Sequence, residues 1–209
     1  MNAWRKKWAQ GEVVVIRYAD DTVLGFQHAT DADRFLEDLR ERLKKFGLEL
    51  HPDKTRRIEF GRFAEENRKR RGERKPETFD FLGFTHISGR NRRGWFSVRR
   101  MTIRKRMRAK LRQIKQQLRK RMHDPVSQTG EWLRSVVQGY FNYHAVPGNI
   151  GSLSGFRDRV LGLWWLTLCR RSQQRLPWTR MLKLGNRWLP RPRVLHPYPV
   201  ARFAASHPR

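Results

Sequence analysis

Two adjacent aspartates, Asp20 and Asp21, stand between two apolar, β-branched runs. Side chains alternate along residues 13–18, which predicts a β-hairpin whose turn falls near Ala19 to Thr22. Two carboxylates at one tight turn repel each other, and a hard divalent cation such as Mg²⁺ relieves that repulsion because it prefers oxygen ligands. Aspartate is also common in ordinary turns, where both side chains point into water. These residues alone therefore allow either a magnesium site or a solvated turn.

The positive charge of the chain is concentrated in its C-terminal part. Residues 1–60 hold 12 Lys/Arg and 11 Asp/Glu, a net charge of +1, whereas residues 61–209 hold 35 and 8, a net charge of +27. Such a polycation repels itself unless it meets a polyanion, and nucleic acid is the usual one because each neutralised phosphate releases condensed counterions. Arginine outnumbers lysine 35 to 12, which suits bidentate phosphate contacts, although a GC-rich genome gives the same bias.

The sequence argues against a secreted or membrane-bound protein. No apolar run approaches the length that crosses a bilayer, and no signal-peptide core follows Met1. Cys169 is the only cysteine, so there is neither a disulfide framework nor a CxxC zinc module. We therefore expect a cytoplasmic protein in a reducing, intracellular setting, with no membrane partner.

The elements that must position the two aspartates form an α+β module. Residues 1–12 look like the end of a helix whose beginning is absent. After the hairpin, Thr30 or Asp31 can cap an amphipathic helix that runs to about Phe46, with Gly47 as its C-terminal stop. This helix is expected to lie on the sheet that contains the hairpin.

Further strands are predicted downstream of that helix. Residues 48–50 and 55–60 have strand-like alternation, whereas residues 61–76 are so rich in Arg, Lys and Glu that a flexible loop is expected. A second hairpin is predicted to pair residues 81–87 with residues 94–98.

From Met101 the periodicity becomes helical. Apolar side chains recur every three or four residues as far as Met122, and two more helices are predicted at 131–145 and 153–174, which suggests a small bundle. The first helix has no acid, and like charges at i,i+4 spacing destabilise an isolated helix, so its basic face makes sense only if phosphates lie against it. The candidate RNA-binding cations are Arg104, Lys105, Arg108, Arg112, Lys115 and Arg119.

The C-terminal tail interleaves aromatic residues with arginines and prolines. Trp178, Trp188 and Tyr198 stand among basic residues from position 176 onward. Aromatic rings beside arginine can stack on unpaired bases, but they can equally pin an extended tail onto the helical bundle. The sequence leaves these two roles open.

Four motifs, taken together, resemble the reverse transcriptase/maturase proteins of group II introns. Tyr18-Ala19-Asp20-Asp21 is similar to the metal-binding hairpin of reverse transcriptases, and residues 47–55 (GLELHPDKT) to the palm motif that follows it. Residues 79–84 (FDFLGF) are similar to the strand that opens the primer-gripping hairpin. Residues 138–144 (QGYFNYH) with 147–149 (PGN) resemble the maturase-specific domain. The resemblance covers essentially the whole chain and implies a bacterial host.

This resemblance implies roles for individual residues. Asp20 would bind the catalytic Mg²⁺ with Asp21 beside it, and Tyr18 would lie near the primer terminus. Lys54 would stand near the phosphates of the incoming nucleotide as a proton donor to pyrophosphate, although an ordinary turn lysine is an equal alternative. Primer support is implied for Phe81, Leu82 and Gly83, and RNA binding for Tyr140, Asn142, Tyr143 and His144.

The resemblance also implies a domain order and a missing part. Residues 1–100 would be a partial palm, 101–175 a helical thumb and maturase-specific domain, and 176–209 a basic tail. Two-metal polymerase chemistry uses carboxylates from two separate strands, and this hairpin supplies only one set. Glu12 is the only earlier carboxylate, and eight residues of strand at about 3.3 Å each place it roughly 26 Å from the tip. The Mg²⁺ site is therefore expected to be incomplete, and the lone chain inactive as a polymerase.

The predicted function is binding of group II intron RNA to assist splicing, with RNA-templated DNA synthesis on template-primer when the protein is complete. A separately encoded N-terminal half would restore the missing aspartate in trans. A non-catalytic RNA-binding splicing factor and an inactive gene remnant are the alternatives.

Overall fold

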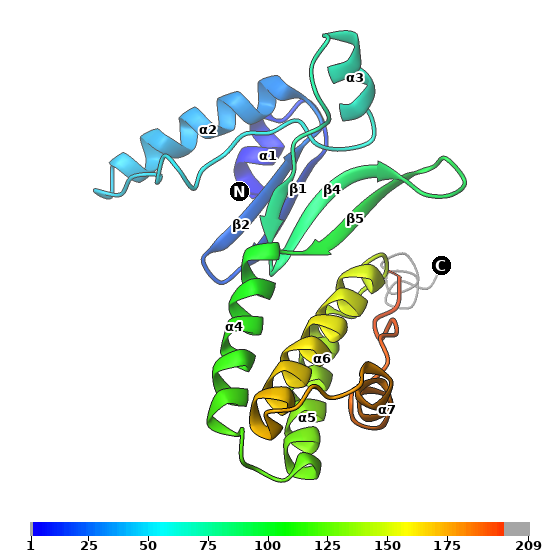
Figure 1. Ribbon diagram of the computed structural model, residues 1–209. Coiled ribbons are helices and arrows are strands. Elements are labelled where there is room, and N and C mark those ends of the chain that lie inside the picture. Colours follow the sequence, from blue (N-terminus) through cyan, green and yellow to red (C-terminus); the bar gives the residue numbers. More distant parts are fainter. Residues whose placement is uncertain (1, 199–209) are drawn as a thin grey trace. The chain divides into compact units, whose positions relative to one another are not determined.

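The computed structural model describes residues 2–198 (Figure 1). Two compact units, residues 1–59 and 60–209, make up the chain. Residues 199–209, the last part of the predicted tail, lie outside the described residues. Among the helices that are described, none is at once long enough and apolar enough to cross a bilayer.

The first unit is built on the predicted hairpin. Strands β1 (Val13–Tyr18) and β2 (Asp21–Phe26) pair in antiparallel fashion. Because Tyr18 lies opposite Asp21, the connection is a two-residue turn of Ala19 and Asp20. Two-residue turns are the commonest hairpin connections, since their twist matches that of the flanking strands. The predicted hairpin is therefore confirmed.

An aromatic cluster joins this hairpin to helices α1 (Asn2–Trp8) and α2 (Ala29–Lys44). The Trp4 ring packs edge-on against Phe35 at 4.9 Å, and Phe26 lies 5.5 Å from Phe35. Trp4 Nε1 also donates a hydrogen bond of 2.5 Å to Asp38. The predicted amphipathic helix on a sheet is confirmed, because the α2 face carrying Phe35 packs on β2.

The predicted cap of α2 is wrong. The helix begins after His28, which gives no side-chain cap, and neither Thr30 nor Asp31 takes that position. The Asp31 carboxylate is 3% exposed and accepts hydrogen bonds from the backbone nitrogens of Gln10 and Gly11, at 3.0 and 3.1 Å. Asp31 therefore closes the loop that leads into β1, a role that its position near a helix start does not reveal.

The predicted stop at Gly47 is confirmed. Gly47 has a φ of +66°, and the backbone nitrogen of Leu48 donates to the carbonyl of Leu43 at 3.0 Å. This bond across six residues satisfies a free carbonyl at the helix end and needs a left-handed residue, which glycine adopts without strain. Phe46, expected on the packed face, is 69% exposed because α2 ends at Lys44.

No strand forms at residues 48–50 or 55–60, so both of those predictions are wrong. Within the described residues, β1 and β2 pair only with each other, and neither segment joins their sheet. Residues 51–55 instead make a turn in which the backbone nitrogens of Lys54 and Thr55 donate to the His51 carbonyl, at 3.2 and 2.9 Å.

The predicted flexible loop at 61–76 contains a helix, α3 (Ala64–Arg70). Acids lie in its first turn and bases in its last, which complements the helix dipole. Arg70 pairs with Glu66 one turn earlier at 2.7 Å, and Arg68 contacts Glu73 at 3.2 Å. The many charged residues of this segment, from which a flexible loop was expected, therefore stabilise a short helix by forming pairs of opposite charge.

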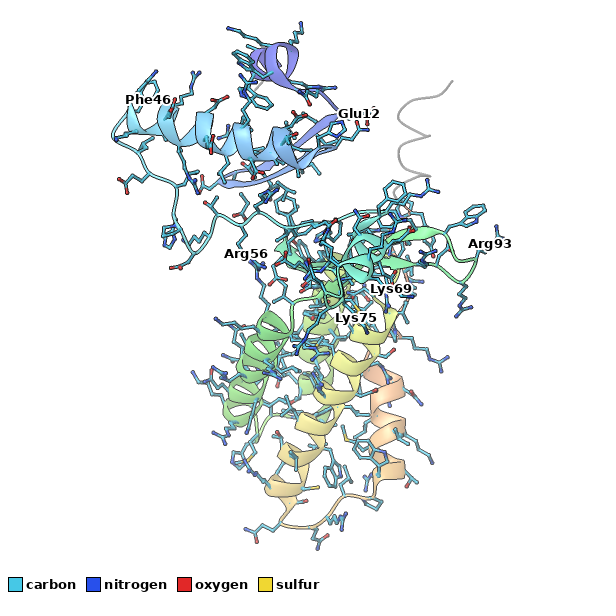
Figure 2. The ribbon with its side chains drawn as sticks, turned by 90° about the horizontal axis from the view of Figure 1, so that it is seen from above. Glu12, Phe46, Arg56, Lys69, Lys75 and Arg93 are labelled. Carbon is cyan, nitrogen blue, oxygen red and sulfur yellow. The ribbon has the colours of Figure 1, made fainter. Side chains whose placement is uncertain are left out.

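The second unit begins with a three-stranded antiparallel sheet in the order β3-β4-β5. Its strands are β3 (Phe79–Phe81), β4 (Phe84–Arg90) and β5 (Phe96–Thr102). The predicted second hairpin is present as β4–β5, but its bounds differ, because Phe81 belongs to β3 and β4 pairs with residues 96–102. Figure 2 shows Arg93 at the tip of this hairpin. The helix expected from Met101 starts later, because Thr102 still pairs with Phe84.

As far as residue 198, four helices follow the sheet: α4 (Arg104–Lys120), α5 (Val126–His144), α6 (Ile150–Ser172) and α7 (Trp178–Trp188). In Figure 1, α4, α5 and α6 run side by side with α7 beside them. The predicted bundle is confirmed, although α5 and α6 begin a turn earlier than expected. Fully buried core side chains include Leu118, Leu133, Val137, Leu153, Phe156, Val160, Trp164 and Met181.

Helix α7 replaces the extended tail that was one of the predicted alternatives. Met181 is fully buried, and a Cβ at Gly185 would lie 2.7 Å from Leu161. A Cβ at Gly130 would lie 2.6 Å from the ring of Trp188, so only glycine allows α5 to approach that ring. Trp188 is therefore a packing residue, whereas Trp178 and Tyr198 remain 46% and 67% exposed.

Candidate metal-binding hairpin and nucleic-acid interface

The turn that carries the adjacent aspartates has an unusual backbone. Ala19 has a φ of +49°, a left-handed conformation that costs a residue with a Cβ about 1–2 kcal/mol. The side chain of Arg17 supports the turn, since its Nε donates to the Ala19 carbonyl at 3.1 Å. Both Asp20 and Asp21 are exposed. A strained turn that presents two carboxylates to solvent is typical of a functional position.

The two carboxylates fit part of a magnesium site. Mg²⁺ keeps several waters and binds proteins through one or two carboxylates together with substrate phosphates, so Asp20 and Asp21 can supply the protein ligands of one ion. Within residues 2–198, no group of three or more His, Cys, Asp or Glu side chains is close enough to hold a metal. Glu12 pairs with Gln27 at the open end of the hairpin, far from the tip, and is labelled in Figure 2.

The structure places the other predicted catalytic residues of this unit on two segments. Tyr18 lies directly opposite Asp21 in the ladder and is 62% exposed. Lys54 is exposed in the separate turn at 51–55. The hairpin thus brings Tyr18, Asp20 and Asp21 together, and Lys54 belongs to the same unit.

In the second unit, the predicted primer-supporting turn packs against the predicted maturase helix. Leu82 and Gly83, between β3 and β4, have φ values of +47° and +82°, as a tight hairpin turn of the mirror-image type requires. The Tyr143 hydroxyl on α5 donates to the Leu82 carbonyl at 2.8 Å. A Cβ at Gly83 would lie 3.2 Å from the Tyr143 ring, so glycine allows this close approach. Phe81, the last residue of β3, pairs with Phe84.

A cavity of about 440 Å³ opens beside that turn. Gly83 contributes one side, α5 contributes Gly139, Tyr143 and His144, and α4 contributes Arg106 and Lys110. Arg106, Lys110 and Gly139 are not among the site residues predicted from the sequence, although Gly139 lies in the motif of residues 138–144. The i,i+4 spacing of Arg106 and Lys110 was a usable signal, because it places both on one side of α4.

Burial shifts the pKa of two residues that line this cavity, Tyr140 and His144. Tyr140 is 8% exposed and stacks on Phe156 at 3.7 Å, and this burial raises its pKa to about 12. Burial also lowers the pKa of His144, and the positive charge of Arg106 lowers it further. The hydrogen bond from Nδ1 to the Tyr140 carbonyl acts in the opposite direction and raises it. His144 is therefore neutral near pH 7, and Tyr140 serves mainly to pack α5 on α6.

Asn142 occupies a more open position on the same helix. Its side-chain oxygen accepts a 2.7 Å hydrogen bond from Gln138, and its backbone carbonyl lies 2.7 Å from Nε2 of His196, which donates to it. Asn142 and Tyr143 are both exposed, and both therefore remain available to a ligand.

The predicted RNA-binding cations form one continuous face of α4. At 100° of rotation per residue, the six positions fall within an arc of about 100°. All six are exposed, and in the described part of the chain none pairs with a carboxylate. The core residues Met107, Ile114 and Leu118 lie outside this arc, on another side of the helix. The basic face of α4 consists of Arg104, Lys105, Arg108, Arg112, Lys115 and Arg119.

One family model matches the first part of the chain. Residues 1–86 match the family model of reverse transcriptase (RNA-dependent DNA polymerase). The match covers the whole first unit, which contains the β1–β2 hairpin, and reaches into β4 of the second unit. A search of the curated proteins found no match to this chain. The match therefore supports a reverse transcriptase-related function, and it includes Tyr18, Asp20, Asp21, Lys54 and the Leu82–Gly83 turn.

Proposed function

We propose that this chain is the C-terminal part of a group II intron-encoded reverse transcriptase/maturase that binds intron RNA to assist splicing. The observation that carries the proposal is the exposed, acid-free basic face of α4, in a chain whose first 86 residues match the reverse transcriptase family. When the protein is complete, it performs RNA-templated DNA synthesis.

The RNA-binding part of the proposal rests on electrostatics. Six cations on one face of α4 repel one another, and an isolated helix with such a face loses stability. Phosphates remove that repulsion and release counterions, so the same face favours RNA strongly at low salt. The exposed Asn142 and Tyr143 on α5 extend this surface beside the Leu82–Gly83 turn.

The catalytic part of the proposal gives each residue of the hairpin a role. Asp20 binds one Mg²⁺ with Asp21 beside it, Tyr18 lies near the primer terminus, and Lys54 stands near the nucleotide phosphates. A two-metal site clamps the attacking and the leaving oxygen. In the reverse transcriptases that this chain resembles, the carboxylates of such a site come from two separate strands. In this proposal, a separately encoded N-terminal half supplies the carboxylate of the second strand in trans, and the chain alone binds RNA without copying it.

Primer extension with Mg²⁺ tests the catalytic part. The purified chain should bind a template-primer but extend it only when the N-terminal half is added, and Asp20→Asn should abolish that extension without weakening RNA binding. Lys54→Gln tests whether Lys54 is the proton donor in this reaction. Lys75→Gln, at another exposed position, is the control. Processive synthesis by the chain alone would contradict the incomplete site.

A splicing assay separates the enzyme from a non-catalytic splicing factor. If the Asp20→Asn chain still promotes splicing and no partner restores DNA synthesis, the protein is a non-catalytic splicing factor. If the chain neither binds RNA nor promotes splicing, the proposal as a whole fails.

A further inference from the structure

A second cavity, of about 580 Å³, lies between α4 and α6 and is separate from the one at the Leu82–Gly83 turn. Its inner surface is apolar, with Leu111 from α4 and Leu163 and Trp165 from α6. Trp178, the first residue of α7, forms one wall. The size lies within the range of about 300–1,000 Å³ that is typical of small-molecule sites in proteins.

The aromatic wall of this cavity is held in place. Trp165 Nε1 donates a 2.8 Å hydrogen bond to the carbonyl of Leu176, so its indole has a fixed orientation. Trp178 packs edge-on against Trp165 with ring centroids 5.7 Å apart, yet Trp178 remains 46% exposed. A positioned and partly exposed indole offers a stacking surface that needs no rearrangement.

Cations line the cavity beside its apolar surface. Arg112 and Lys115 come from the basic face of α4, and Arg159 comes from α6. No acid is among the lining residues that the structure describes. The guanidinium of Arg159 lies 3.4 Å from the sulfur of Met107 on α4. This contact keeps the Arg159 side chain close to α4.

We propose that this cavity takes one unpaired base of a bound RNA, stacked at Trp178, with the neighbouring phosphates on Arg112, Lys115 and Arg159. This inference rests on the proposed RNA-binding function and names the part of the RNA that the site recognises. An apolar recess beside three cations is complementary to a nucleotide, which combines an aromatic face with a negative charge. Base stacking on aromatic side chains adds about tenfold or more to affinity.

Glycine 162 provides a direct way to fill the cavity. Gly162 lines it, and a Cβ built there meets nothing within 4 Å, so a larger side chain can start at this position without a clash at its Cβ. Gly155 lies on the same helix, and a Cβ there also meets nothing within 4 Å, but Gly155 does not line the cavity. Gly162→Leu and Gly155→Leu are therefore a matched test and control, and both replace a helical glycine with a better helix former.

The probes are two single-stranded RNAs of about twelve nucleotides, a length within the usual site size. One is abasic throughout, and the other carries a single 2-aminopurine at its centre. The full chain should bind the single-base RNA about tenfold more tightly than the abasic RNA and quench its fluorescence. Gly162→Leu should remove this preference while leaving affinity for the abasic RNA unchanged. Gly155→Leu should retain the preference.

Each outcome has a distinct meaning. If the chain binds the abasic RNA in a salt-dependent way but Gly162→Leu retains the base preference, the cavity assignment is overturned while the proposed function stands. If the chain binds neither RNA, the proposed RNA-binding function is wrong, and the cavity assignment that rests on it is wrong as well. If Gly162→Leu blocks only an acidic amphipathic peptide, the cavity is a protein-binding site and the inference is wrong. Should Gly162→Leu not fold, Trp178→Ser removes the exposed wall and must abolish the same preference.

Discussion

The side chain of Asn149 is hydrogen-bonded twice to Thr102. Asn149 is fully buried, its oxygen accepts from the Thr102 backbone nitrogen at 3.1 Å, and its nitrogen donates to the Thr102 hydroxyl at 2.8 Å. The same nitrogen donates to the His144 carbonyl at 2.8 Å. One side chain thus ties the end of β5 to the connection between α5 and α6, and so positions the sheet against the helices that form the candidate interface.

Removing this side chain should destabilise the second unit. Asn149→Ala leaves the buried Thr102 backbone nitrogen without its acceptor, and an unsatisfied buried group costs about 1–3 kcal/mol. The substitution also removes the hydrogen bonds that Asn149 donates to the Thr102 hydroxyl and to the His144 carbonyl, although that carbonyl keeps the one from the Val146 backbone nitrogen. We expect a loss of roughly 2–4 kcal/mol in the free energy of unfolding, measured by urea denaturation. Gln116→Ala, at an exposed position on α4, should change it by less than about 0.5 kcal/mol. Equal effects of the two substitutions would contradict the assigned role of Asn149.

The close approach at Gly83 can be separated from its backbone conformation. Gly83 and Gly94 have similar φ values, +82° and +80°, but only a Cβ at Gly83 meets a neighbour, the Tyr143 ring. Alanine at either position should cost about 1–2 kcal/mol for the left-handed backbone. Gly83→Ala should cost more than Gly94→Ala in thermal or urea unfolding, and Tyr143→Ala should remove that excess. An excess that persists without the Tyr143 ring would show that the strain has another source.

Stability should fall as the pH is lowered through the histidine range. Because burial lowers the pKa of His144 in the folded state, the unfolded state binds more protons once the pH drops below about 6.5. The stabilisation from neutral His144 is therefore complete above that pH and is lost below it. His86, whose pKa burial also lowers, acts in the same direction.

Melting temperatures measured between about pH 8 and pH 5 test this. His144→Phe should weaken the pH dependence, and His123→Gln, an exposed histidine of the same unit, is the matched control. A wild-type slope retained in full by His144→Phe would rule out His144 as the cause.

Local patterns predicted the elements whose partners are close in sequence. Alternation around Asp20 fixed the first hairpin, and the three-to-four periodicity from Met107 to Leu118 fixed α4, because both depend on neighbours within a few residues. Asp31 was misread as a cap because its partners, Gln10 and Gly11, lie twenty residues away. No local signal reports such a contact.

Residues whose role depends on tertiary packing could not be placed beforehand. The strand-like alternation at 55–60 is a local pattern, and in the described part of the chain this segment joins neither sheet. Helix α7 depends on burying Met181 against α5 and α6, a contact that the interleaved prolines and arginines of residues 176–209 do not reveal. Of the candidate site, the sequence predicted the aspartates and the basic face, whereas the cavities at Gly83 and Gly162 emerge only from helix packing.

The salt dependence of RNA binding tests the central claim most directly. For a structured RNA, each phosphate contact made by the chain contributes about 0.9 to the slope of log affinity against log salt concentration. The triple variant Arg104→Gln, Arg108→Gln, Arg119→Gln removes three cations from the basic face of α4 but none from the cavity at Gly162. Lys6→Gln, Arg40→Gln, Lys44→Gln removes the same charge from exposed positions of the nearly neutral first unit.

The account predicts that the α4 variant lowers this slope by about two to three, with a large loss of affinity, while the control leaves it nearly unchanged. Equal slopes in the wild-type chain and the α4 variant would contradict the proposal that α4 is the RNA-binding face.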